Sequence, residues 1–133
     1  MQYALEKGLN RFLLALDPLN VIVNKRIANE FANKMEKPYV VCMLNAGQDA
    51  NLQQREQGEF RYAIKGVAKK VQTAGLIARV LRTGLHEQTF EIDAPYVMDR
   101  IQHTTVVKYT EMVDNVQIYH WGGIFRIRVS EEF

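Results

Sequence analysis

The stretch FRYAIKGVAKKVQTAGLIARVLRTGL, residues 60–85, decides the fold, because its apolar pattern changes partway along. Phe60, Tyr62 and Ile64 alternate with smaller or charged residues, as in a half-buried strand with a period of about two. From Val71 onward the apolar residues recur on one helical face, which ends at Leu85. The sequence therefore predicts a strand over 60–68 that leads almost directly into a helix over about 69–85.

This stretch also has an unusual charge. It carries 6 basic residues and no acidic one, whereas the rest of the chain has 11 bases and 15 acids. The net charge of +2 is therefore the sum of +6 in the stretch and −4 elsewhere. Such an uneven distribution predicts a basic surface on one part of the molecule.

Two interpretations of the basic residues stay open. Arg61 and Lys65 share one face of their strand, and Arg126 and Arg128 alternate with apolar residues near the end of the chain. If the two strands are neighbours, the four side chains form a stripe that would attract phosphates. Alternatively, they make the outer face soluble and pair with acids. The acids in question are Glu111, Asp114, Glu131 and Glu132.

Length and composition predict a single domain over residues 1–133. The chain is 47% apolar and 24% charged, and it has no run of about 20 apolar residues of the kind that crosses a membrane. Its first 16 residues are interrupted by charges, unlike a signal peptide, so we expect synthesis inside the cell. The single cysteine, Cys42, lies in an apolar run and is predicted to pack as a small hydrophobic residue.

The N-terminal third predicts one long helix and one core strand. Apolar residues at helical spacing predict a helix over about 3–16, which Asp17-Pro18 should end. Residues 21–23 are then predicted to form a short extended segment. Residues 24–37 fit either a second short helix or a loop with a strand fragment at 26–29. Residues 38–44 are apolar on both faces after Pro38, which favours a central strand.

Residues 45–59 are polar and glycine-containing, which predicts a long exposed loop between two strands. Loops of this length are often ordered by a partner. The candidate partner contacts in it are Gln48, Asp49, Asn51, Gln53, Gln54, Arg55 and Glu56.

The C-terminal third predicts a β hairpin. A turn at residues 93–95 leads to a strand over 101–110, and Asp114-Asn115 marks a turn into a strand over 116–129, with Gly122-Gly123 as a candidate bulge. The expected architecture is an α+β fold. A mostly antiparallel sheet packs against two main helices, over about 3–16 and 69–85, and the chain closes with the hairpin.

No catalytic or metal motif is recognisable. His86, His103 and His120 are too widely spaced for a zinc motif, and no cysteine or close carboxylate pair accompanies them. The only serine is Ser130, and no nucleotide-binding glycine pattern occurs. We therefore expect neither an enzyme nor a bound cofactor.

The order of elements resembles the small tail-completion or tail-terminator proteins of tailed bacteriophages. The features that carry the resemblance are an N-terminal amphipathic helix, the strand that begins Pro38-Tyr39-Val40-Val41, the strand-to-helix stretch 60–85, and the aromatic and arginine alternation of 119–129. The resemblance spans nearly the whole chain. Where members of the family often have an acidic or small residue before the long helix, this chain has Lys65-Gly66, and residues 24–37 align poorly.

The resemblance implies a non-enzymatic virion protein, made in the host cytoplasm. Such a protein forms a ring, expected to be a hexamer, on the head-proximal end of the tail tube. It stops tube growth and offers a surface to the head–tail connector, with DNA passing through the channel and no membrane involved. Arg61, Lys65, Arg126 and Arg128 would then face either acids of the next subunit or the channel. The alternatives are a head-completion or neck protein of the same particle, and a small nucleic-acid-binding module.

Overall fold

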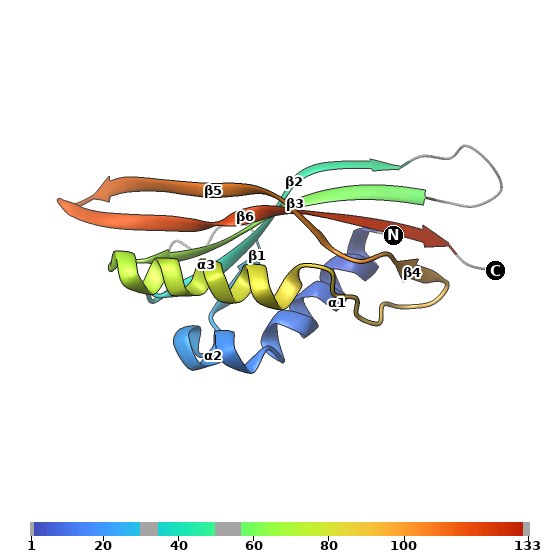
Figure 1. Ribbon diagram of the computed structural model, residues 1–133, viewed down its shortest axis with the longest axis horizontal. Coiled ribbons are helices and arrows are strands. Elements are labelled where there is room, and N and C mark those ends of the chain that lie inside the picture. Colours follow the sequence, from blue (N-terminus) through green and yellow to red (C-terminus); the bar gives the residue numbers. More distant parts are fainter. Residues whose placement is uncertain (1, 30–34, 50–56, 132–133) are drawn as a thin grey trace.

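The computed structural model describes residues 2–29, 35–49 and 57–131. These residues form one sheet with its helices on a single face (Figure 1). The helices are α1 (Gln2–Leu14), α2 (Asp17–Val23) and α3 (Val71–Leu85). The strands are β1 (Ile27–Asn29), β2 (Tyr39–Asp49), β3 (Gln57–Ala68), β4 (Tyr96–Met98), β5 (Gln102–Val113) and β6 (Val116–Glu131).

The sheet is antiparallel except for one strand pair. Its order is β1-β2-β3-β6-β4, and β5 also pairs with β6. Only β1 and β2 run parallel among the described strands. One edge of the long strand β6 pairs with β3, while its other edge pairs first with β5 and then with β4. The predicted α+β architecture with a C-terminal hairpin is confirmed.

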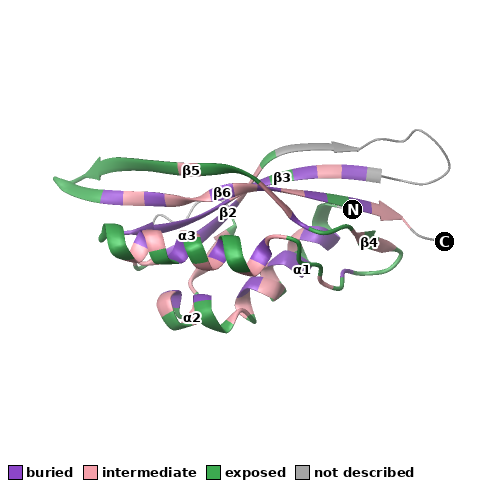
Figure 2. Ribbon diagram, viewed as in Figure 1, coloured by how far each residue is buried: buried purple, intermediate pink, exposed green. Residues whose placement is uncertain are grey.

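The core lies between the helices and the sheet. Leu5, Leu9 and Leu13 form the buried face of α1, because residues four apart share one side of a helix. In α3 the buried face is Ala74, Ile77, Leu81 and Leu85, whereas Val71 is exposed at the start of the helix. The strands contribute alternate residues, among them Tyr62, Ile64, Phe125 and Ile127 (Figure 2). Cys42 is buried in this core, as predicted.

The extended piece predicted at residues 21–23 is wrong, because these residues end α2. Pro18 does not simply stop the first helix. It occupies the first turn of a second one, where a missing N–H costs nothing. The Asn20 side chain donates hydrogen bonds to the carbonyl oxygens of Leu13, Leu14 and Leu16 at 2.9, 3.0 and 3.0 Å. These bonds satisfy the end of α1 and fix the corner between the two helices.

Residues 27–29 form β1, within the strand fragment predicted at 26–29, and residues 30–34 lie outside the described residues. The predicted loop over 45–59 is wrong at both ends, since β2 continues to Asp49 and β3 begins at Gln57. Backbone pairing continues there, with Gln48 opposite Glu59 and Asp49 opposite Gly58. Polar side chains do not prevent this pairing, because strand ladders are made by the backbone.

The predicted hairpin turn is confirmed, but the bulge is misplaced. Asp114 and Asn115 have φ of 51° and 64°, as a two-residue type I′ turn requires. Gly122 and Gly123 pair in register with Lys65 and Ile64. The register shift lies instead on β5, between His103 and Thr105.

Gly122 is needed for close strand approach rather than for a bulge. A Cβ atom at this position would collide with the backbone of Ile64 and Lys65 on β3. The two strands therefore approach each other more closely here than any other residue would allow.

Candidate interaction surfaces

The sheet face opposite the helices carries a second buried cluster. We call it the helix-free face, and it is defined by residues that alternate with the core positions. Tyr39, Val41, Val67 and Ile118 are buried together on it. A polar network lies beside this cluster, so the face is not simply a solvated surface.

The polar network consists of Lys65, Tyr109, Glu111 and His120. The Lys65 ammonium donates a hydrogen bond to the Tyr109 hydroxyl and lies 4.7 Å from the centre of that ring. The Tyr109 and His120 rings stack with centroids 4.5 Å apart. His120 Nε2 and Glu111 Oε1 are 2.6 Å apart. Lys65 was predicted as an interface or channel residue. It is only 9% exposed, and its ammonium group is bound to Tyr109 of the same chain.

The pKa of His120 is lowered, chiefly because burial disfavours the charged ring. The Glu111 carboxylate opposes this effect, and the nearby Lys65 ammonium adds to it. Within the described chain, Nδ1 is buried without a hydrogen-bond partner. A proton on this atom would therefore be unsatisfied, so we take the ring as neutral with Nε2 donating to the carboxylate.

This arrangement predicts that the protein loses stability as the pH falls below about 6.5, the ordinary histidine value. A group whose folded pKa is lowered stabilises the fold above its unfolded pKa, and that contribution disappears as the pH falls through the folded value. His103, whose pKa burial also lowers, acts in the same direction. Urea titrations at several pH values would measure this dependence. His120→Gln should flatten it in part, and an unchanged slope in that variant would contradict the assignment.

The arginines of the predicted stripe do come together on the helix-free face. Arg61 lies directly opposite Arg126, and Arg128 opposite Glu59, in the β3–β6 ladder. Glu59 Oε1 lies 3.5 Å from Arg126 Nε and 3.9 Å from both Arg61 Nη2 and Arg128 Nε. One carboxylate thus serves three guanidinium groups, which leaves the surface basic.

The acids predicted to neutralise this stripe form no ion pair with it among the described residues. Glu111 binds His120 instead, and Glu132 lies outside the described residues. A shallow pocket of 320 Å³ adjoins the stripe. Its lining residues are Asp99, Arg100, Gln102, Arg126 and Arg128. Glu59 was missed because it sits in the segment interpreted as a loop.

Of the predicted loop contacts, Gln48 and Asp49 lie at the end of β2. The other candidates lie outside the described residues, namely Asn51, Gln53, Gln54, Arg55 and Glu56.

The β5–β6 hairpin projects past the end of its neighbour β3. Ala68, the last residue of β3, pairs with Tyr119, so residues 111–118 extend beyond it. We call these residues the arm tip. Met112, Val113 and Val116 of the arm tip are 61%, 45% and 43% exposed, and Figure 2 shows this end of β5 as exposed. A concentration of exposed apolar side chains is typical of interaction surfaces.

The remaining edge of β5 is open as well. β5 pairs with β6 only, among the strands the structure describes. It is 12 residues long and contains no proline. Long unprotected edges invite pairing with another chain. β5 and the arm tip together are therefore a candidate assembly surface. The arm tip could have been found from the sequence. Beside the Asp114-Asn115 turn, apolar residues occupy consecutive positions, so they point to both faces of the hairpin and cannot all be buried on one side.

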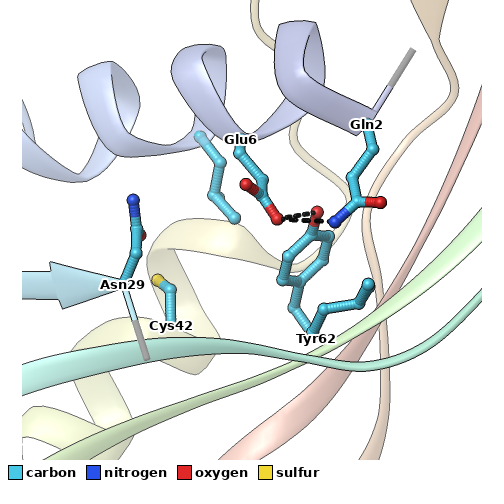
Figure 3. Close-up of a pocket in the computed structure, with 7 residues that line it drawn as sticks. Gln2, Glu6, Asn29, Cys42 and Tyr62 are labelled. Carbon is cyan, nitrogen blue, oxygen red and sulfur yellow. Dashed lines mark hydrogen bonds between the residues drawn. The ribbon is translucent and has the colours of Figure 1, made fainter. Parts of the chain in front are cut away.

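A polar pocket lies between α1 and the sheet (Figure 3). It has a volume of 450 Å³, and the Glu6 carboxylate accepts hydrogen bonds from Tyr62 Oη and Gln2 Nε2, both at 3.1 Å. Burial raises the pKa of the Cys42 thiol to about 12, and it raises the pKa of Tyr62 as well. Neither group ionises near neutral pH, so these two side chains offer no nucleophile.

The described residues contain no group of three or more potential metal ligands among His, Cys, Asp and Glu. Within the same residues, no helix is long and apolar enough to cross a membrane.

Comparison with known proteins shows the fold and not a family. No protein-family model matches the chain, and no curated protein matches it. Among solved structures, a chain of the virion of a native gene transfer agent particle is similar, with a TM-score of 0.76. The match covers 97% of this chain and 96% of that chain at 16% identity. The two chains therefore share their fold from end to end.

Proposed function

We propose that this protein is a structural component of a phage-like virion. It forms a ring that caps the head-proximal end of the tail tube, stops tube growth and provides the surface for head joining. The observation that supports the proposal is the unpaired edge of β5 with the exposed apolar side chains of the arm tip, on a fold similar along its length to a gene transfer agent virion chain. The partners would be further copies of this chain, the tail tube protein and the head–tail connector.

The physical argument concerns how a polymer stops. A tube grows through head-to-tail contacts that repeat without closing, and growth ends when a subunit matches the tube end on one side only. A ring of this chain needs contacts between neighbours that close on themselves. The arm tip and the open β5 edge lie at one side of the sheet, whereas β1 and β2 form the other side. Two different sides in contact give the head-to-tail geometry that a ring requires.

The arginine stripe has a role in the same proposal. Arg61, Arg126 and Arg128 remain on the surface after pairing with Glu59, whereas Lys65 is buried. A basic surface of this kind attracts DNA phosphates without reading sequence. The three arginines would face either the channel through which DNA passes or acids of the neighbouring subunit.

The proposal is tested by inactivating the gene in the strain that makes the particles. We expect tails of uncontrolled length that fail to join heads, seen by negative-stain electron microscopy, and restoration by a plasmid copy. Tails of normal length attached to heads would contradict the capping role. Normal tails beside separate, filled heads would instead indicate a head-completion protein.

A second experiment addresses the arginines. In an Arg126→Glu, Arg128→Glu variant, ring assembly measured against salt concentration should fall if the arginines contact a neighbouring subunit. If assembly is unchanged and DNA delivery falls, they line the channel. The two changes place carboxylates beside Glu59, so urea denaturation of the variant is needed to show that it is folded before its assembly is compared.

A further inference from the structure

A half-apolar, half-basic pocket lies at the end of β3 where α3 begins. It has a volume of 450 Å³. Its apolar lining is Ile22, Pro38 and Ala68, and its polar lining is Lys37, Lys69, Lys70 and Thr73. Lys69 and Lys70 are exposed, and none of the three lysines forms an ion pair within the described chain. The Lys37 ammonium also lies 6.0 Å from the centre of the Tyr39 ring. The exposed Lys69 and Lys70 therefore supply most of the unpaired positive charge beside the apolar lining.

The chain carries a segment of complementary chemistry at the opposite end of the sheet. β6 ends at Glu131, and the next residues are Glu132 and Phe133. Glu131-Glu132 is the only pair of adjacent acids in the sequence, and Lys69-Lys70 is the only pair of adjacent lysines. Two carboxylates followed by an aromatic ring match a pocket that has both ammonium groups and apolar walls.

This segment cannot reach the pocket of its own chain. Gln57, at the start of β3, pairs with Ser130, whereas Ala68, at its end, pairs with Tyr119. The 12 residues of β3 span about 40 Å. Two residues beyond Glu131 extend at most about 7 Å. The occupant must therefore come from another copy.

We infer that residues 131–133 of one copy dock into the Lys37/Lys69/Lys70 pocket of the next. The segment and the pocket are different surfaces of the chain, so the contact is head-to-tail, as in a closed ring. The ring itself comes from the proposed function, and the inference rests on it. The start of α3, which contributes Lys70 and Thr73 to the pocket region, lies at the same end of the sheet as the β5–β6 hairpin tip (Figure 1). A nucleic acid would use the lysines but not the apolar walls, which favours the peptide segment.

Charge reversal on the full-length chain tests the contact, with association measured by sedimentation velocity. Lys69→Glu, Lys70→Glu should weaken self-association by about tenfold or more, and Glu131→Lys, Glu132→Lys should do the same. Combining all four changes should restore association, because the charges are complementary again. The matched control is Arg11→Glu, Arg82→Glu, which makes the same charge change at exposed positions near the ends of α1 and α3, outside the pocket lining. This control should leave association unchanged.

A peptide of residues 128–133 provides a second readout. The fluorescently labelled peptide should bind the wild-type chain and the control, and it should fail to bind the Lys69→Glu, Lys70→Glu variant. The inference is wrong if the variant with all four changes does not regain self-association. A wild-type chain that neither associates nor binds the peptide would also contradict the inference. It is also wrong if the lysine variant loses DNA retention while the glutamate variant assembles normally, since that result identifies a nucleic-acid site. Tail length in the gene-inactivated strain tests the capping role separately.

Discussion

A chain carrying Met112→Glu and Val116→Lys is expected to remain folded and monomeric, and to fail to restore tail length in the gene-inactivated strain. Both side chains lie at the arm tip, past the end of β3, and are 61% and 43% exposed. Their replacement costs the monomer little, because surface positions tolerate substitution. In an assembly, however, each would place a charge where an apolar side chain is needed. Replacing two central apolar side chains together should weaken association roughly 100-fold.

The matched control for the arm tip is Tyr3→Glu, Val21→Lys. These side chains are 76% and 86% exposed and lie on α1 and α2. The double change removes comparable apolar surface and adds the same pair of charges, so a general loss of solubility would affect both variants equally. Light scattering over a range of concentrations would show the difference. Equal assembly by the arm-tip variant and the wild type would show that this surface is not used.

Gly122→Ala is expected to destabilise the monomer by about 3 kcal/mol, which is large for one methyl group. The added Cβ would collide with the backbone of Ile64 and Lys65, and backbone in the middle of a sheet cannot move aside as a side chain can. Either β3 and β6 separate at this point or the ladder between them distorts. The loss of free energy of unfolding would be measured by urea denaturation.

Gly75→Ala is the control for this effect. Its Cβ would meet only the Trp121 ring, at 3.3 Å, from a position inside α3. Alanine is better than glycine in a helix interior by about 1 kcal/mol, and this gain offsets the shift of a few tenths of an ångström that the Trp121 side chain must make. The loss of stability should therefore be far smaller than for Gly122→Ala. If both glycine variants were equally tolerated, close approach of the two strands would not be what Gly122 provides.

How far the sequence predicted the fold depended on local periodicity. The change of period within residues 60–85 correctly predicted β3 followed by α3, and Asp114-Asn115 correctly predicted the hairpin turn. Local patterns failed where a distant partner decided the outcome. Residues 45–49 carry no strand pattern of their own, yet they extend β2 because Gly58 and Glu59 are available to pair with them. Residues 21–23 are β-branched, but α2 forms because Pro18 and Asn20 fix its start and its corner.

The candidate site was predictable only in part, for a similar reason. The sequence placed Arg61, Arg126 and Arg128 on the polar faces of two strands, and their meeting required those strands to be neighbours. Lys65 belonged to the same pattern, but the curled sheet brings Tyr109 over it and buries it. Glu59 and the three-lysine pocket depend on segments far apart in the sequence.

Local sequence alone specified the elements with a strong period, the uneven charge and the hairpin turn. These are properties of neighbouring residues, and a few dihedral preferences and apolar spacings are enough to define them. Tertiary packing was needed to settle which charges are shared, which lysine is buried and which apolar residues stay exposed at the arm tip. Burial and pairing depend on which strands become neighbours, and that choice is made by the packing of the whole chain.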